Sequence, residues 1–364
     1  MKITVHKERF ARALGFVERI TSRNSSLPIL NNVLLKTEHG RLKVSATNLE
    51  IGVTSVIGAS VEREGQIAVP GKTIADFVRS VPGETLDINV DQHTLSASSG
   101  SYQTSILCFD PAEYPIIPKI DGGEQFVVSV ETLQRLIDTV SDSIATSDSR
   151  PELSGALLRF DTGIVSMAAT DIFRLAEQRE DGEFSSSGAA IVPRGTIYEL
   201  RRVLGGLSGD ITVHLTDNQI AFVHEDCEIV SRLIDGKYPD YKKIIPERAN
   251  ARVLVRREEI ENAVKTAALF SSSISDIKLE CSGAELKITG KNSNKGEAYA
   301  GVEANLKGDP FDVSMNYHYL LDGLRAVPTE KIILEFTGKG SPFVLRPHSD
   351  DPRTVYLIMP LRSS

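Results

Sequence analysis

A pattern of five apolar positions occurs three times along the chain. In each copy, two alternating apolar residues typical of a short strand precede three apolar residues spaced as on one face of a helix. The second copy begins 123 residues after the first, and the third begins 127 residues after the second. Such a period predicts a repeated structural unit. The positions are Ile3, Val5, Phe10, Leu14 and Val17; Phe126, Val128, Leu133, Ile137 and Val140; and Val253, Val255, Ile260, Val264 and Ala267.

The repetition extends through each copy. Residues 40–48 and 163–171 share one pattern, and a second helical pattern begins near Ile74, Ile197 and Leu320. We interpret three similar tripeptides as the ends of the copies: Ile116-Ile117-Pro118, Ile244-Ile245-Pro246 and Ile358-Met359-Pro360. The sequence therefore predicts three domains of ordinary size, over residues 1–122, 123–247 and 248–364.

Each copy is predicted to be an α+β unit. Two helices and about eight alternating segments per copy favour helices packed on one face of an antiparallel sheet. Pro70 and Pro193 precede the second helix in two copies, which suits the first helical turn because the missing N–H has no partner there. The predicted helices span 6–23, 72–79, 131–138, 194–202, 256–265 and 318–325.

Composition places the chain among ordinary globular proteins. Hydrophobic residues make up 41% of its 364 residues and charged residues 25%. There is no apolar run of the roughly 20 residues that a membrane helix needs, and the first residues do not form a secretion signal. We therefore expect a cytoplasmic protein with no membrane partner. The three cysteines are far apart, which argues against a disulfide framework or a zinc site.

The charge is unevenly distributed. The formal net charge is −8, but the six predicted helices contain 15 Lys/Arg and 10 Asp/Glu. Mildly cationic helices in an acidic protein fit a surface that faces phosphates while the remainder repels polyanions. Solvated helix faces explain the same numbers equally well.

No motif predicts catalysis, a metal or a cofactor. Gly71-Lys72-Thr73 resembles the end of a phosphate-binding loop, but position 66 is Gln where that motif has Gly. Asp142, Asp148 and Asp171 could be imagined as a magnesium cluster, yet no spacing brings them together. We expect no metal and no cofactor.

Two segments combine apolar residues with turn or terminal positions. In residues 169–176, Ile172 and Phe173 follow a turn-like Thr-Asp, and residues 355–362 bring Met359 and Leu361 close to the end of the sequence. Exposed apolar residues of this kind would mark a docking groove. Ordinary strand cores are the alternative interpretation.

At these residues the chain resembles the beta subunit of bacterial DNA polymerase III, the family of sliding clamps. The resemblance spans all three copies. Its motifs are Leu27-Pro28-Ile29-Leu30 with Asn32, Ala169-Thr170-Asp171, Arg174-Leu175-Ala176, Val192-Pro193-Arg194, residues 235–241 and Met359-Pro360-Leu361-Arg362.

The resemblance implies a non-catalytic processivity factor without a cofactor. It implies a head-to-tail homodimer whose six domains form a ring around duplex DNA, with helices lining the hole, and contacts to DNA that do not depend on sequence. The partners it implies are the replicative polymerase alpha subunit, the clamp loader and other proteins that present short peptides with apolar ends. An enzyme with a site at a domain junction and a repeat scaffold that binds no DNA are the alternatives.

The resemblance also implies three sets of functional residues. The peptide-binding groove would comprise Leu153, Thr170, Ile172, Phe173, Arg174, Leu175, Pro239, Lys243, Ile244, Pro342, Leu357, Ile358, Met359, Pro360, Leu361 and Arg362. The DNA-facing residues would be Arg9, Arg12, Arg23, Lys72, Arg79, Arg135, Arg150, Arg194, Arg201 and Lys265, and the dimer interface Ile106, Leu269 and Phe270. The chain departs from the usual pattern at Ile172-Phe173, where the family has Gly-His, and at Lys243, where it has Arg.

Overall fold

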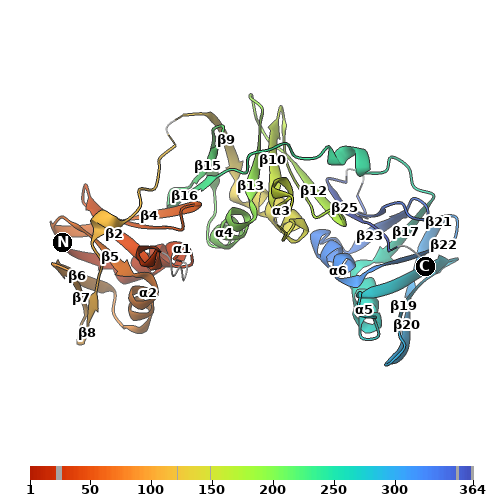
Figure 1. Ribbon diagram of the computed structural model, residues 1–364, viewed down its shortest axis with the longest axis horizontal. Helices are drawn as coiled ribbons and strands as arrows, with labels where there is room; N and C mark the ends of the chain where they lie inside the picture. The colour runs from red at the N-terminus through yellow and green to blue at the C-terminus, as the bar shows by residue number, and fades with distance from the viewer. Residues whose placement is uncertain (22–26, 121, 148, 350–351, 362–364) are drawn as a thin grey trace. The chain divides into compact units, whose positions relative to one another are not determined.

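The computed structural model describes residues 1–21, 27–120, 122–147, 149–349 and 352–361. Two α-helices belong to each of the three repeats (Figure 1). They are α1 (Lys7–Val17) and α2 (Gly71–Ser80), α3 (Val130–Val140) and α4 (Arg194–Leu204), and α5 (Arg257–Ala268) and α6 (Tyr317–Ala326).

The strands follow a similar order in each repeat, with one more strand in the third. The first repeat has β1 (Lys2–His6), β2 (Asn32–Glu38), β3 (Arg41–Thr47), β4 (Ile51–Arg63), β5 (Gln66–Pro70), β6 (Thr85–Asp91), β7 (Thr94–Ser99) and β8 (Tyr102–Leu107). The second has β9 (Glu124–Ser129), β10 (Gly155–Asp161), β11 (Ile164–Thr170), β12 (Arg174–Asp181), β13 (Gly188–Pro193), β14 (Asp210–Leu215), β15 (Gln219–Val223) and β16 (Cys227–Arg232). The third has β17 (Ala251–Arg256), β18 (Asp276–Ser282), β19 (Glu285–Asn292), β20 (Gly296–Glu303), β21 (Asn305–Gly308), β22 (Phe311–Asn316), β23 (Lys331–Phe336), β24 (Phe343–Pro347) and β25 (Thr354–Ile358).

The predicted repeat describes the core correctly. All fifteen apolar positions of the threefold pattern are buried. In α1, for example, Phe10, Leu14 and Val17 have no exposed surface. The helices therefore bury the stripe that the sequence predicts, and each copy builds its core from the same five positions.

One helix boundary was predicted wrongly. The helix expected over residues 6–23 ends at Val17, because the backbone then tightens into a turn in which the N–H of Ile20 donates to the carbonyl of Val17. Ile20 is still buried, since this turn keeps its side chain on the core side. Apolar spacing alone does not distinguish such a turn from one more helical turn.

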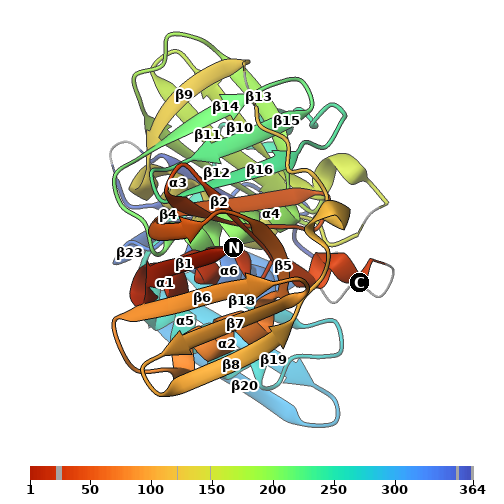
Figure 2. The same ribbon diagram turned by 90° about the vertical axis from the view of Figure 1, so that its left-hand side faces the viewer.

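The chain forms two compact units that do not follow the repeat boundaries. One unit is Met1–Val130 with Arg202–Leu233, and the other is Glu131–Arg201 with Ile234–Ser364. The first contains a 12-stranded sheet. Nine of its strands follow the path β8-β7-β6-β1-β4-β16-β15-β14-β9, and β2, β3 and β5 are attached beside this path. Within it, β6, β7 and β8 lie side by side (Figure 2). The second contains a nine-stranded sheet, β13-β10-β11-β12-β25-β24-β23-β17-β21, and a four-stranded sheet, β20-β19-β18-β22.

Strand pairing between repeats explains why the units cut across them. The last strand of the second repeat, β16, pairs antiparallel with β4 of the first, with Ser231 opposite Ile51. The last strand of the third repeat, β25, pairs in the same way with β12 of the second, with Ile358 opposite Arg174. Both junctions thus pair the last strand of one repeat with the fourth strand of the repeat before it.

These registers correct the expected end of the third repeat. Ile358 ends β25 and occupies the position of Ser231, so residues 358–360 correspond to residues 231–233. The tripeptides at residues 116–118 and 244–246 instead lie beyond the last strands of their repeats. The match of Ile358-Met359-Pro360 to them was therefore coincidental, because three residues carry too little pattern to fix a register. The three domain boundaries stay a prediction.

Replacing Leu14 by Ala tests the repeated core. Leu14 is fully buried in α1, so Leu14→Ala should lower the free energy of unfolding by about 2–5 kcal/mol in a urea titration. Arg9→Ala, an exposed change on the same helix, should alter it by no more than about 0.5 kcal/mol. Equal effects of the two changes would contradict the predicted helix face.

Candidate functional site

A tight turn joins β11 to β12 at Thr170–Arg174. The Thr170 hydroxyl donates to the carbonyl of Arg174 at 2.7 Å and accepts from the N–H of Ile172 at 3.2 Å. Asp171 Oδ1 accepts the N–H groups of Phe173 and Arg174, both at 3.0 Å. These short polar side chains fix the turn and leave its apolar tip in solvent, where Ile172 and Phe173 are 55% and 54% exposed.

The same turn occurs between β3 and β4 in the first repeat. Thr47 donates to the carbonyl of Ile51 at 2.9 Å and accepts from the N–H of Leu49 at 3.0 Å. Asn48 Oδ1 accepts from the N–H groups of Glu50 and Ile51 at 3.0 and 2.8 Å. In the first two copies, the repetition therefore extends to individual hydrogen bonds.

Both turns hold an apolar residue in the left-handed region. Ile172 has φ 73° and Leu49 has φ 76°. This conformation favours glycine, and it is least favourable for a β-branched side chain such as isoleucine. The resemblance predicts glycine at the position of Ile172, whereas this chain has a large apolar side chain at the tip of the turn.

An apolar cluster lies beneath the turn, where β12 pairs with β25. Its buried members include Leu153, Leu175 and Leu357, and Met359 packs against it while half exposed. The N–H of Met359 donates to the carbonyl of Phe173 at 2.8 Å, which ties the segment after β25 to the turn. We call this set the β12–β25 cluster; it also contains Ala145, Ala168, Ile191, Tyr238, Tyr241, Val344 and Val355, with Leu157, Ile234 and Ile245 at its margin.

Arg174 supports the cluster from the side of α6. Its guanidinium pairs with Asp171 at 2.9 Å and with Asp322. It lies 4.6 Å from the centre of the Tyr319 ring, and Phe173 stacks on the same ring with 6.4 Å between centroids. Burial alone would lower the pKa of Arg174, but Tyr356, Asp171 and Asp322 raise it, so the guanidinium stays charged.

Two tyrosines complete the frame of the turn. The Tyr238 hydroxyl accepts from the N–H of Thr170 at 3.1 Å, and the Tyr241 hydroxyl donates to Glu177 at 2.6 Å. Burial raises the pKa of both phenols, and the Glu177 carboxylate raises that of Tyr241 further. The two side chains therefore act as neutral hydrogen-bonding groups.

The predicted groove residues divide between the cluster and its surroundings. Leu153, Leu175, Leu357 and Met359 come together in it. Ile358 is buried, but its side chain belongs to the other face because neighbouring strand residues alternate. Lys243 is exposed and pairs with Asp240 at 2.8 Å. Thr170 and Arg174 support the turn, Ile172 and Phe173 form its tip, Ile244 is exposed, Pro239, Pro342, Pro360 and Leu361 are half-buried, and Arg362 lies outside the described residues.

Sequence reasoning missed several members of this site. Tyr238, Tyr241 and Val344 are buried in the cluster, and Tyr319 stacks beside it. The two tyrosines stand within the motif of residues 235–241, so the motif contained the signal. Tyr319 had no local signal, because its neighbour Phe173 lies far away in the sequence.

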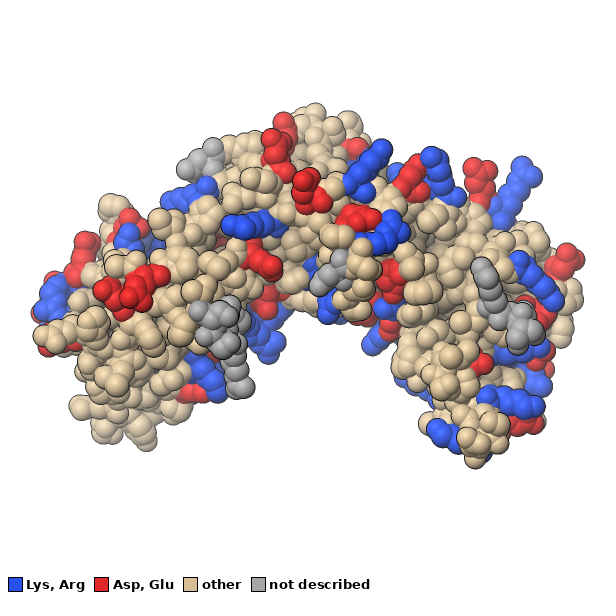
Figure 3. All heavy atoms as spheres, in the orientation of Figure 1, with Lys and Arg blue, Asp and Glu red and all other residues tan. Residues whose placement is uncertain are grey.

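Most predicted DNA-facing residues lie on helices, and most are paired with carboxylates. Arg9, Arg12, Lys72, Arg79, Arg135, Arg194, Arg201 and Lys265 are on helices, Arg150 directly precedes a short 3-10 helix (Pro151–Leu153), and Arg23 lies outside the described residues. The ion pairs include Arg12–Asp226 at 2.9 Å, Arg135–Glu180 at 2.9 Å and Arg201–Asp138 at 2.6 Å. Lys72, Arg79, Arg150 and Lys265 also pair with carboxylates, and Arg194 lies over the Tyr198 ring. On the face drawn in Figure 3, Lys and Arg are interspersed with Asp and Glu.

The three predicted interface residues differ in exposure. Leu269, just after α5, is 68% exposed, and Phe270 is half-buried. Ile106 is buried within its own repeat, whereas its neighbour Leu107 on β8 is 79% exposed. On β20, Tyr299 is 72% exposed. Both β8 and β20 end their sheets, so each combines a free edge with exposed apolar side chains.

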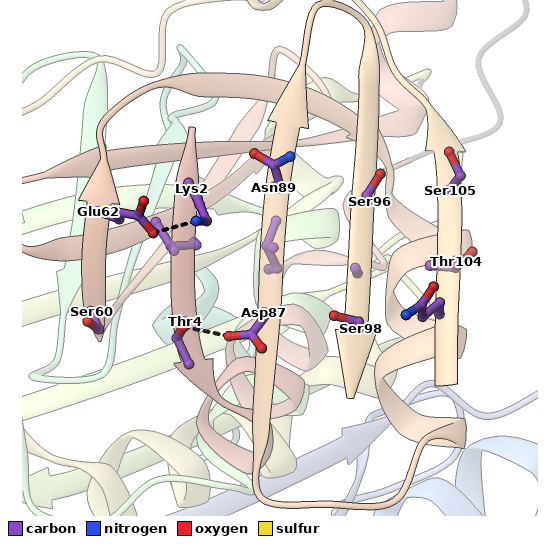
Figure 4. A pocket seen from close by; sticks show the side chains of 14 residues that line it. Lys2, Thr4, Ser60, Glu62, Asp87, Asn89, Ser96, Ser98, Thr104 and Ser105 are labelled. Atoms are coloured by element: carbon purple, nitrogen blue, oxygen red, sulfur yellow. Dashed lines mark hydrogen bonds and ion pairs between the residues drawn. The ribbon is translucent and has the colours of Figure 1, made fainter. Parts of the chain in front are cut away.

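A hollow over the outer sheet of the first repeat has no catalytic arrangement. It covers about 840 Å³ over strands β4, β1, β6, β7 and β8 (Figure 4). Its labelled side chains are mostly hydroxyls and amides, and its charged groups form ordinary contacts, such as Lys2–Glu62 at 2.7 Å. Thr4 donates to Asp87 at 2.6 Å. A polar sheet face with such contacts lacks a nucleophile paired with a base.

One group of described side chains could be considered for a metal, namely His224, Glu225 and Asp226. Both ring nitrogens of His224 are occupied, because Nε2 bonds to the carbonyl of Ser208 at 2.9 Å and Nδ1 accepts from the N–H of Asp226 at 3.1 Å. Asp226 also pairs with Arg12. Burial raises the pKa of the Cys108 thiol to about 11 and that of Cys227 to about 12, so both are unreactive near neutral pH. Among the described residues, no helix is long and apolar enough to span a membrane.

Repeated α+β units joined by strand pairing define the class of DNA-clamp proteins. Family models of the DNA polymerase III beta subunit match the N-terminal domain over residues 1–118, the central domain over 127–240 and the C-terminal domain over 242–362. The chain is 30% identical over 367 residues to the beta sliding clamp of Pseudomonas aeruginosa and 26% identical over 376 residues to that of Staphylococcus aureus, with 100% of each chain covered.

Solved structures agree with this assignment. The beta subunit of Thermotoga maritima superposes with a TM-score of 0.95 at 26% identity, and that of Pseudomonas aeruginosa with 0.95 at 29%, each covering 100% of both chains. The chain belongs to the DNA polymerase III beta subunit family, the bacterial sliding clamps. It is a non-catalytic processivity factor of DNA replication.

Glycine substitution tests whether the two turns hold strained apolar residues. A left-handed conformation costs about 1–2 kcal/mol for a residue with a Cβ, while the greater chain entropy of glycine costs about 0.5–1 kcal/mol. Ile172→Gly and Leu49→Gly should therefore raise the free energy of unfolding by about 0.5–1 kcal/mol each. Glu50→Gly, which is also exposed but has an ordinary φ, should lower it. Loss of stability in all three variants would show that the tip side chains stabilise the fold.

Proposed function

We propose that two copies of this chain close head to tail into a ring around duplex DNA and that the β12–β25 cluster binds peptides of the replication machinery. One observation carries the ring. The junctions β16–β4 and β25–β12 use one pairing rule, and the rule has a third instance only if β8 of one copy pairs with β20 of another. In a ring formed in this way, the open edges of β8 and β20 would each gain a partner strand.

The rule also predicts the register of this third junction. The hairpin pairings place Gly296–Ala300 of β20 where Ile51–Ser55 and Arg174–Gln178 stand in the other repeats. Likewise, Tyr102–Ile106 of β8 corresponds to Cys227–Ser231 of β16. Antiparallel pairing then sets residues 296–300 opposite residues 106–102 of the second copy. The exposed Leu107, Leu269 and Tyr299 would be covered by this contact.

The ion pairs on the helices suit a clamp that slides. An arginine that already contacts a carboxylate gains little from a phosphate, because the phosphate must replace an existing partner. Contacts to the phosphate backbone are then brief and independent of sequence. Retention on DNA would come from enclosure, and the DNA-facing residues would serve mainly to keep the duplex centred.

The β12–β25 cluster has the features of a peptide site. Half-buried Met359 lies at its margin beside a turn that Thr170, Asp171 and Tyr238 hold through hydrogen bonds, so a peptide that binds there gains apolar contact area at a small entropy cost. Ile172 and Phe173 give this site a bulkier wall than the family pattern with Gly-His. We expect a preference for peptides with flexible or smaller residues next to this wall and large apolar residues over Met359.

Three finer assignments belong to the same proposal. The replicative polymerase alpha subunit and the clamp loader would both present such peptides, and they would compete because both would bind the β12–β25 cluster. The protein would act in the cytoplasm, where the chromosome is replicated. A ring must also be opened before it can enclose closed DNA, which requires a loading partner.

Linearisation of DNA tests enclosure directly. Protein loaded onto a nicked circular plasmid should stay bound for many minutes in gel filtration at about 0.5 M salt and should leave once a restriction enzyme opens the circle. Linear DNA with a bulky protein blocking each end serves as the control and should retain the ring. Equal retention on open linear DNA would indicate ordinary attachment, and no retention on circles would support a scaffold without DNA.

Replacing Met359 by Ala tests the peptide site. A fluorescent peptide ending in two large apolar residues should bind the native protein in an anisotropy titration and bind Met359→Ala at least about tenfold more weakly, because an apolar anchor of the site is lost. Thr162→Ala, in the exposed turn at the other end of β11, is the matched control. Unchanged affinity in Met359→Ala would place the peptide elsewhere.

A further inference from the structure

One arginine occupies the same place in the second helix of every repeat. Arg79, Arg202 and Arg325 are spaced 123 residues apart, each in the last turns of its helix. Each follows an acidic residue by three positions, namely Asp76, Glu199 and Asp322. This polar pattern is separate from the apolar positions that form the core of these helices.

Arg202 reaches the end of the first helix in the preceding repeat. Its Nη1 donates to the carbonyl of Gly15 and its Nη2 to the carbonyl of Phe16, both at 2.6 Å. These carbonyls lie in the last turn of α1, where helix carbonyls lack N–H partners from the helix itself and carry the negative end of its dipole. The guanidinium satisfies two of them with charge-assisted bonds.

Arg325 reaches the corresponding place one repeat further on. Its Nη2 lies 3.7 Å from Asp142 Oδ2 and also contacts Asp322 in its own helix. Asp142 belongs to the single 3-10 turn Ser141–Ser143 that directly follows α3. Both arginines therefore extend from the second helix of one repeat to the end of the first helix of the repeat before it.

Arg79 belongs to the first of the three repeats. Its Nη1 donates to both oxygens of Glu18 at 3.0 and 2.9 Å, and its Nη2 donates to Asp76 at 2.8 Å. Its side chain is 47% exposed. These contacts use three of the five guanidinium N–H groups and leave two for another acceptor.

We propose that Arg79 donates across the ring interface to the last turn of α5 in a second copy of this chain. The positions equivalent to Gly15 and Phe16 are Lys265 and Thr266, each 250 residues later. The acceptors are the backbone carbonyls of these two residues. This inference rests on the proposed ring and adds a polar anchor beside the β8–β20 pairing.

The end of α5 suits this contact. Lys265 is engaged with Glu261 at 2.6 Å, so its side chain does not cover its own carbonyl end. The N–H of Leu269 donates to the carbonyl of Thr266 at 3.3 Å, and a carbonyl oxygen has a second lone pair for another donor. Leu269, which is exposed one turn beyond, lies where the ring interface is proposed. A charged donor arriving here meets the negative end of the helix dipole.

The dimer dissociation constant tests the inference. We expect Arg79→Gln to raise it by about 100-fold, because each of the two interfaces in a ring loses a charge-assisted contact whose loss costs about tenfold. Lys72→Gln, an exposed change on the same helix that also removes a partner of Asp76, is the matched control and should alter it less than twofold. Sedimentation velocity over a dilution series measures all three proteins.

Glu18→Gln separates a contact across the interface from a contact within the repeat. If Arg79 acted only through Glu18, Glu18→Gln would weaken the dimer as much as Arg79→Gln does, and the proposal would be overturned. A contact of Arg79 across the interface predicts an unchanged or tighter dimer for Glu18→Gln, because the guanidinium is released from the Glu18 carboxylate. Circular dichroism confirms folding of each variant.

The outcomes distinguish this inference from the ring itself. A native protein that stays monomeric at micromolar concentration overturns the ring and the Arg79 contact together. A native dimer whose dissociation constant is the same in Arg79→Gln overturns the contact alone, and weaker retention of that variant on circular DNA would then assign Arg79 to the DNA.

Discussion

Pairing of a final strand with a strand of the preceding repeat is the interaction on which this structure depends. A strand edge exposes backbone N–H and C=O groups that need partners, and it invites uncontrolled association when it is left open. β16 meets this requirement on β4, and β25 meets it on β12. The same pairing extends one continuous sheet across each junction. For this reason, part of the second repeat forms a compact unit with the first repeat, and the rest forms one with the third. Neighbouring repeats are thus joined by backbone hydrogen bonds.

The sequence predicted the repeated core because buried positions obey a local rule. Phe10, Leu14 and Val17 must recur at helical spacing whatever surrounds them, and all are buried. The end of α1 at Val17 could not be read in this way, because a tight turn and a helical turn direct Ile20 toward the same core. Contacts between repeats were even harder to predict from the sequence. Arg202 and Gly15 are 187 positions apart, and only the recurrence of an acid and an arginine three residues later in each second helix marks them.

The two polar turns show how one backbone frame supports different surfaces. At residues 47–51 and 170–174, a threonine and an Asn or Asp make the same four hydrogen bonds, and each holds an apolar residue at positive φ. The following positions differ, with Glu50 and Ile51 in one copy and Phe173 and Arg174 in the other. Phe173 can stack on Tyr319, and Arg174 can pair with Asp322, only because α6 lies beside the second turn. The resemblance predicted a site at this turn, and the residues that surround the turn in the structure come also from β25 and α6, which the turn's own residues do not encode.

Electrostatics and enclosure make opposite demands on such a protein. A clamp that held DNA by charge alone would need many free cations, and its affinity would fall steeply as salt rises. Here the cations of the helices are largely matched by nearby carboxylates such as Asp226, Glu180 and Asp138. Pairs of this kind are weak enough to exchange with passing phosphates, yet they keep the surface from binding any one segment firmly. A chain with a formal net charge of −8 can therefore surround a polyanion without adhering to it, provided that the edges of its sheets close the ring. In the proposed ring, strand pairing would supply the lifetime on DNA, and balanced charge would supply the mobility.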